Sequence, residues 1–321
     1  MKTLVLFNNK GGVGKTTLVY HLAHMLARTG YRTLAVDLDP QANLTSAFFD
    51  EERLEEIWED GKESVLAAIQ PRLAGTGDIV PASTIEVQER LFVIAGDLGL
   101  GRFEDKLSLS WPQGFRNDES ALRDTTAFFR IVHEAGATTS ADIAVIDVGP
   151  NLGAINRAAL LSADYLLVPL AADLFSLQGL RNLGPVIRQW RREWQNVLGL
   201  ASAPFDMPKG NLEPVGYVVQ QHAVRLDRPA KHFAKWMERI PAVYRDTVIG
   251  KPASTIPEPD PECLARLRNY RSLMPMAQDA RKPMFDLRAA DGAIGSHAAL
   301  AQTCYRDFEN LAALVADRCG L

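Results

Sequence analysis

The 321-residue sequence predicts an α/β fold, a doubly wound and mostly parallel central β-sheet flanked by helices. An apolar strand, a glycine-rich turn, a helix and a second apolar strand follow one another over residues 3–39. This is the order of a βαβ unit, whose strands are parallel and whose crossover is right-handed. A later apolar strand ends at Asp147, and ligands bind outside the carboxyl ends of the strands in such sheets.

The hydrophobic pattern predicts each element of the βαβ unit. Residues 3–7 (TLVLF) form a short β-branched and aliphatic run, as in a buried strand. Apolar residues then recur at helical spacing from Leu18 to Leu26, and Gly30 follows as the expected C-cap. Residues 33–39 (TLAVDLD) form the second buried strand.

The remaining sequence predicts further alternating elements within one domain over residues 1–321. We expect a third strand and a helix within residues 78–108, a strand at 165–170 between two helices, and a core strand with a following loop at 215–225. No long linker and no internal repeat divides the chain. Turn-forming residues predict loop insertions near 109–120, 201–214 and 250–262.

Composition and charge limit the class of protein. The chain has 47% hydrophobic and 23% charged residues and a net charge of -4, which suits a globular protein and argues against a globally basic nucleic-acid coat. Its three cysteines form no CxxC pair, which fits a reducing compartment. The first apolar run is too short for a signal peptide, and no run of about 18 apolar residues occurs. We therefore expect a cytoplasmic protein.

Residues 8–17 (NNKGGVGKTT) follow the first strand and predict a phosphate-binding loop. Glycines there can adopt positive φ, so that successive backbone N–H groups converge on one anion. The helix that begins near Lys15 adds free N–H donors and the positive end of its dipole. Lys15 would reach the β- and γ-phosphates, and the Thr16 hydroxyl would bind Mg²⁺. The competing interpretation is a flexible turn with a chance GKT. The expected nucleotide-binding residues are Gly11, Gly12, Val13, Gly14, Lys15, Thr16 and Thr17.

Two residues of this loop depart from the general pattern G-x-x-x-x-G-K-[ST]. Asn9 stands where that pattern has glycine, and Lys10 is an additional lysine. With them, KGGVGKTT resembles the deviant Walker A motif K-G-G-x-G-K-[ST]-[ST] of the ParA/MinD family of P-loop ATPases, nearest to ParA/Soj-like partition ATPases. The resemblance implies ATP, Mg²⁺ and a homodimer in which Lys10 reaches the partner's nucleotide, comparable in role to an arginine finger. The alternative is a solvated loop lysine.

The stretch DLDPQAN at residues 37–43 resembles switch I of the same family. The resemblance implies that Asp39 positions or activates the attacking water and contributes to the metal site, with Asp37 as a neighbour that supports this site. Alternatively, Asp39 is only a turn residue before Pro40. With the loop, this implies Lys10, Lys15 and Asp39 as catalytic residues.

The apolar strand that ends at Asp147 is the Walker B arrangement, in which the carboxylate holds Mg²⁺, usually through water. The implied metal-site residues are therefore Thr16, Asp39 and Asp147. Relatives continue D-x-P-P, whereas this chain has Gly149 before Pro150. The missing proline predicts a more flexible switch II turn.

Members of the family bind either non-specific DNA or a membrane when dimeric. The tail at 297–321 mixes acidic and basic residues on its polar side, so we expect a core-packing helix rather than a basic membrane-binding one. Two basic clusters favour DNA, the first interleaved with Trp190 and Trp194, although each could be a solvated helix face. The candidate DNA-binding residues are Arg188, Arg191, Arg192, Lys231 and Lys235.

The predicted function is an ATP-dependent dimerising switch ATPase that binds DNA non-specifically and partitions or positions a plasmid, chromosome or protein cargo. A ParB-like or other adaptor protein is a possible partner. The alternatives are a MinD-like membrane-associated ATPase and a nucleotide-gated scaffold with little turnover. A nitrogenase-iron-protein-like reductase would need cysteines near the switches, where none lies. A kinase or synthetase would need an acceptor pocket. We expect a base-contacting residue within 215–225 or near Ile240.

Overall fold

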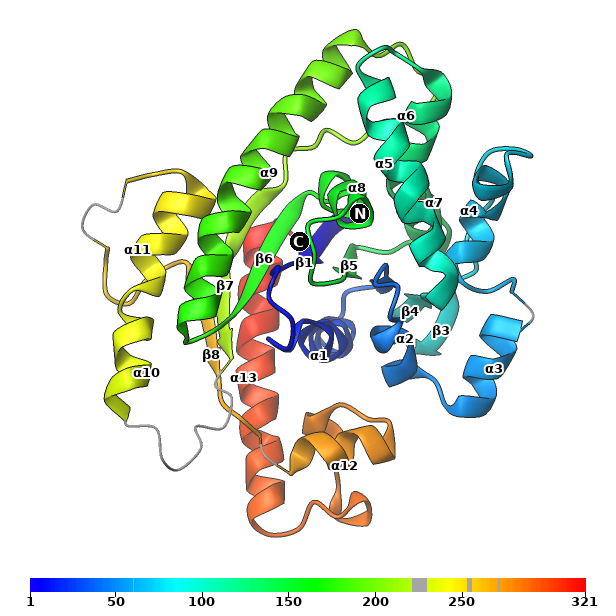
Figure 1. Ribbon diagram of the computed structural model, residues 1–321. Coiled ribbons are helices and arrows are strands. Elements are labelled where there is room, and N and C mark those ends of the chain that lie inside the picture. Colours follow the sequence, from blue (N-terminus) through cyan, green and yellow to red (C-terminus); the bar gives the residue numbers. More distant parts are fainter. Residues whose placement is uncertain (60, 221–229, 253–255, 271) are drawn as a thin grey trace.

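The structure is a computed structural model that describes residues 1–321 except 60, 221–229, 253–255 and 271, and without the side chains of 230–233. An eight-stranded sheet forms its centre, in the order β3-β4-β2-β5-β1-β6-β7-β8 (Figure 1). Every neighbouring pair is parallel except the antiparallel edge pair β3 and β4. The strands are β1 (Lys2–Leu6), β2 (Thr33–Asp37), β3 (Ile85–Gln88), β4 (Leu91–Ile94), β5 (Ile143–Asp147), β6 (Tyr165–Ala171), β7 (Glu213–Gln220) and β8 (Cys263–Leu267).

Helices cover both faces of the sheet, which confirms the doubly wound α/β prediction (Figure 1). The helices are α1 (Lys15–Arg28), α2 (Asn43–Phe48), α3 (Glu51–Glu59), α4 (Val65–Ala74), α5 (Arg102–Gly114), α6 (Glu119–Thr125), α7 (Ala127–Thr139), α8 (Ala154–Ser162), α9 (Leu174–Leu200), α10 (Ala230–Met237), α11 (Ile240–Tyr244), α12 (Leu273–Ala280) and α13 (Ser296–Cys319). Four short helical turns are η1 (Leu98–Gly101), η2 (Arg245–Ile249), η3 (Met284–Asp286) and η4 (Ala289–Asp291). No helix in the described parts of the chain is long and apolar enough to cross a membrane.

The strands alternate their side chains between two hydrophobic cores, one on each face of the sheet. In β1, Leu4 and Leu6 join the core that contains α1, α12 and α13. Val5 and the following Phe7 join the core that contains α5, α7, α8 and α9. Each such buried aliphatic or aromatic side chain contributes about 1.5–3 kcal/mol relative to exposure, so both faces require a helical layer.

The strand register brings the motif residues to one edge of the sheet. Asp147 at the end of β5 pairs with Leu6 of β1 on one side and with Asp37 of β2 on the other. The phosphate-binding loop leaves β1 one residue later. The loop and both acidic strand ends therefore share the carboxyl edge, where ligands bind in parallel sheets.

One of the three predicted loop insertions is partly wrong. Residues 109–114 complete helix α5 although Pro112 lies among them. Buried positions at Phe103, Leu107, Ser110 and Gly114 keep a helical spacing to the end of this helix, so packing outweighs the turn propensity. Residues 201–212 and the described residues of 250–262 contain no helix or strand.

Candidate functional site

The phosphate-binding loop has the backbone that its glycines predict. Gly12 and Gly14 have φ of 72° and 76°, a left-handed conformation that other residues adopt only with strain. A Cβ on Gly14 would also lie 2.3 Å from Oε1 of Gln220, whose Nε2 donates to the Gly14 carbonyl at 3.0 Å. Glycine at position 14 is therefore required both by the turn and by the close approach of β7.

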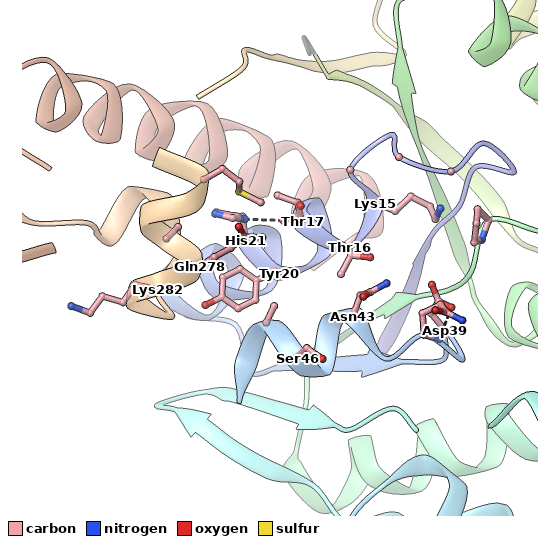
Figure 2. Close-up of a pocket in the computed structure, with 18 residues that line it drawn as sticks. Lys15, Thr16, Thr17, Tyr20, His21, Asp39, Asn43, Ser46, Gln278 and Lys282 are labelled. Carbon is pink, nitrogen blue, oxygen red and sulfur yellow. Dashed lines mark hydrogen bonds between the residues drawn. The ribbon is translucent and has the colours of Figure 1, made fainter. Parts of the chain in front are cut away.

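Lys15 opens helix α1 and faces the acidic strand ends. Its side chain is buried, and burial lowers the pKa of its ammonium, while the charges of Asp147 and Asp39 oppose that effect. Lys15, Thr16 and Asp39 lie on the wall of one cavity of about 620 Å³ (Figure 2). The two sequence motifs thus meet around a single cavity with a cation on one side and carboxylates on the other.

Asp147 has the environment of a metal-site carboxylate. It is completely buried, and neither carboxylate oxygen has a hydrogen-bond partner in the described part of the chain. Burial, and next the charge of Asp37, raises the pKa of Asp147 to about 8. Buried polar atoms without partners are rare and call for a water or an ion. The residues therefore fit a Mg²⁺ ion reached through water, with the Thr16 hydroxyl as an oxygen ligand.

Asp37 and Asp39 divide their tasks differently from the simplest expectation. The Asp37 carboxylate accepts hydrogen bonds from the Thr45 amide at 2.8 Å, the Thr45 hydroxyl at 2.7 Å and the Asp39 amide at 3.2 Å. It therefore anchors α2 and the backbone of Asp39, and supports a metal site only by placing Asp39. Asp39 accepts from the Gln41 amide at 3.0 Å, as a turn residue does, and also lines the cavity.

Lys10 does not line the cavity of its own chain. Its ammonium forms an ion pair with Asp173, the N-cap residue of α9, and lies 5.8 Å from the ring centre of Phe175. The Lys10 amide also donates to the Asn8 side chain at 2.9 Å. The interpretation of Lys10 as a solvated lysine is therefore wrong, because a specific carboxylate holds it.

Asn9 packs against the same helix. A Cβ on Gly179 in α9 would lie 2.8 Å from the Asn9 Oδ1 atom, so this glycine gives the loop its room. The start of the loop and the first turns of α9 are consequently in close contact. The departure from glycine at position 9 belongs to this contact rather than to the phosphate cradle.

A second cavity of about 140 Å³ adjoins the phosphate-binding loop. Gly14, Thr17 and Met274 line both cavities, and Gln220 and Tyr270 line the smaller one. Gln220 falls within the segment expected to contact a base, of which residues 221–225 lie outside the described residues. Ile240 is buried at the start of α11 and lines neither cavity. The contributions of β8 and α12 follow no sequence motif and were not predicted.

The residues predicted to bind DNA have different surroundings. Arg191 and Arg192 line an open groove on α9, whereas Arg188 donates to the Thr247 carbonyl. Lys235 is exposed on α10, where its ammonium lies 5.3 Å from the Trp236 ring centre. The side chain of Lys231 lies outside the described residues.

The aromatic part of the first basic cluster is not available for stacking on bases. Trp190 is 8% exposed and Trp194 is 1% exposed, and both belong to the core. The indole N–H of Trp194 donates to the Pro208 carbonyl at 2.8 Å. They occupy the buried face of α9, which the linear sequence interleaves with its exposed face.

The histidine behind the cavity makes a pH-dependent contribution to stability. The Met284 amide donates to Nε2 of His21 at 3.0 Å, so Nδ1 carries the proton and donates to the Thr17 carbonyl at 2.8 Å. Burial lowers the pKa of His21 to about 4. Between pH 6.5 and 4 the unfolded chain therefore binds this proton and the folded chain does not, so stability falls as pH falls.

We expect the wild type to lose about 2 kcal/mol more unfolding free energy than His21→Gln between pH 7.5 and pH 5.0. Urea denaturation at both pH values measures this difference, and the other titrating groups cancel in the comparison. Equal losses in the two proteins would contradict a neutral, buried His21.

Comparison with known proteins gives a consistent set of relatives. A family model described as an AAA domain matches residues 1–200. Protein IncC of Escherichia coli is 29% identical over 250 residues, which cover 78% of this chain and 59% of that protein. The chromosome partitioning protein ParA of Caulobacter vibrioides is 28% identical over 225 residues, covering 69% of this chain and 76% of the relative. The chain spans 50–59% of the length of the first three curated relatives.

Solved structures share the fold over nearly the whole chain. Protein DIP2308 of Corynebacterium diphtheriae gives a TM-score of 0.69 at 23% identity, covering 99% of this chain and 98% of the other. A putative plasmid partition protein of Borrelia burgdorferi B31, solved with AMPPNP bound, gives 0.60 at 19% identity and covers 98% of each chain.

Proposed function

Because the chain belongs to the ParA/MinD-type P-loop ATPases of the AAA-domain family, we propose that it hydrolyses ATP to ADP and phosphate as a switch. In this proposal ATP favours a homodimer, the dimer binds DNA non-specifically, and hydrolysis dissolves the dimer and releases the DNA. The output is the partition or positioning of a plasmid, a chromosome or a protein cargo. The observation that carries the proposal is the single cavity around which Lys15, Thr16 and Asp39 meet.

The residues around the cavity have separable tasks in hydrolysis. The backbone N–H groups of the loop and the Lys15 ammonium bind the β- and γ-phosphates and stabilise the charge that develops on them. Thr16, with Asp147 through water, would hold Mg²⁺, which neutralises phosphate charge when bound. Asp39 orients the attacking water. The small cavity beside Gln220 and Tyr270 offers a position for the base.

Dimer formation would require Lys10 to leave Asp173 for the phosphates of the partner's nucleotide. ATP can shift the equilibrium towards a dimer only through contacts that the free chain lacks, and an additional ammonium on the γ-phosphate is such a contact. The exposed side chains of Leu174 and Phe175, 50% and 71% accessible, lie beside the same ion pair. These apolar groups would be covered by the partner.

DNA is favoured over a membrane as the surface that the dimer binds. The apolar face of α13, including Phe308, Leu311 and Val315, is buried in the core and cannot lie on a bilayer. The exposed Arg192 and Lys235 can neutralise phosphates without reading bases. Binding of this kind would place the protein on the nucleoid in the cytoplasm and would leave cargo choice to an adaptor protein.

DNA binding is expected to require ATP and to weaken steeply with salt. Fluorescence anisotropy of a labelled duplex should show affinity falling by about tenfold or more between 50 and 200 mM salt. The double variant Arg191→Ala with Arg192→Ala should reduce the salt slope by about two units, one for each phosphate contact. Arg306→Ala, an exposed arginine of α13, is the matched control. Binding that is absent or independent of ATP would contradict the proposal.

A further inference from the structure

We propose that Asn156 and Glu104 are positioning residues that hold the turn at residues 149–151 against Asp39. This inference rests on the proposed ATPase function and concerns the same site. Neither residue lines the cavity, so both would act through the backbone of the turn. The turn is the segment in which relatives carry a second proline and this chain has Gly149.

The turn stands directly beside the acid that orients the attacking water. A Cβ on Gly149 would lie 3.3 Å from the Asp39 Oδ1 atom, a tight van der Waals distance. A Cβ on Gly11 would lie 3.9 Å from the Pro150 ring, so the turn also borders the phosphate-binding loop. Any displacement of this turn changes the space in which a water beside Asp39 can lie.

Asn156 fastens the turn from behind. Its Nδ2 atom donates to the Gly149 carbonyl at 2.8 Å and to the Asn151 carbonyl at 2.7 Å. The side chain is 1% exposed, so water does not compete for these bonds. The two carbonyls converge on one amide group, which fixes the turn at both ends. Asn156 thereby supplies a constraint that a second proline would otherwise provide.

Glu104 fixes the helix on which Asn156 lies. Its carboxylate accepts from the amides of Ala154 and Ile155 at 2.5 and 2.8 Å, and so caps the N-terminus of α8. A carboxylate at that end is also stabilised by the helix dipole. A Cβ on Gly153 would lie 2.5 Å from Glu104 Oε1, so the glycine gives the cap its room. Helix α5 thus positions the first turn of α8, and Asn156 transmits that position to Gly149.

Losing the fastening should impair the chemical step more than nucleotide binding, because it misplaces the water and leaves the phosphate cradle intact. For Asn156→Ala we expect kcat to fall about tenfold, while KM for ATP stays within about twofold. Asn156→Asp keeps the shape but cannot donate to either carbonyl, and should show the same loss. Asn196→Ala, an exposed asparagine of α9, should behave as the wild type. Glu104→Ala should show a smaller loss in kcat, with the exposed Asp105→Ala on the same helix unchanged.

A double-mutant cycle separates positioning from a general structural defect. In an Asp39→Ala background, Asn156→Ala should cause no further loss, since both act on the same water. Hydrogen exchange of the amides at 148–155 should be faster in Asn156→Ala than in the wild type without nucleotide. Wild-type kcat and unchanged exchange in Asn156→Ala would overturn the inference, as would an equal rate loss in both backgrounds. Absence of ATPase activity in the wild type would instead overturn the proposed function, and the exchange measurement would still test the fastening.

Discussion

Replacing Asp39 with alanine is expected to lower ATP turnover by about 10²- to 10⁴-fold, the range in which a positioned acid or base contributes. Nucleotide binding should persist, because the loop glycines and Lys15 bind the phosphates without Asp39. The ATP-bound dimer should therefore accumulate. Phosphate release measures the first effect and light scattering with ATP measures the second.

Asp39→Asn is the matched variant for this prediction, since it preserves the shape and the Asx-turn acceptor for the Gln41 amide. It should show the same low turnover, which separates the charge of the carboxylate from its role in the turn. A monomer with ATP bound to Asp39→Ala would count against the proposed dimer. Wild-type turnover in either variant would remove Asp39 from the reaction.

Replacing Lys10 with alanine is expected to abolish ATP-induced dimerisation and to reduce turnover by about 10²- to 10³-fold, at or below the range of an arginine finger. The affinity of the single chain for nucleotide should change little, because Lys10 pairs with Asp173 outside the cavity. Equilibrium binding of a fluorescent ATP analogue and sedimentation with ATP measure the two quantities.

Lys106→Ala is a suitable control for Lys10→Ala. Lys106 is a similarly half-buried lysine that lies 3.9 Å from the Asp124 carboxylate, far along the chain from the loop. It should dimerise and hydrolyse ATP as the wild type does. If Lys10→Ala abolished nucleotide binding outright, Lys10 would instead be a ligand within its own chain.

Local patterns predicted the fold and the centre of the site. The period-2 and period-3.6 hydrophobic patterns located the strands and helices, and the motifs at 10–17 and 37–43 and Asp147 supplied the cavity residues. These signals succeed because each motif lies at the end of a buried parallel strand, and such ends share one edge of the sheet. The prediction of a loop at 109–114 was wrong because burial of the α5 face outweighed Pro112.

The contacts that the sequence did not predict are long-range and have no repeating pattern. Lys10 and Asp173 are 163 positions apart, and Glu104 lies 50 positions from the amide of Ala154 that it caps. Nothing local to either residue indicates its partner. The missing proline at Gly149 suggested a flexible turn, whereas Asn156 holds that turn with two hydrogen bonds.

The most direct test of the central claim, that Lys10 acts on the partner's nucleotide, is a mixture of two inactive variants. Lys10→Ala retains Asp39, and Asp39→Ala retains Lys10, so one site of the mixed dimer contains both groups in their proposed positions. We predict ATPase activity in the mixture that neither variant shows alone, up to about a quarter of the wild-type rate for random pairing in a symmetric dimer. Activity that stays at the sum of the two variants at every mixing ratio would contradict the account.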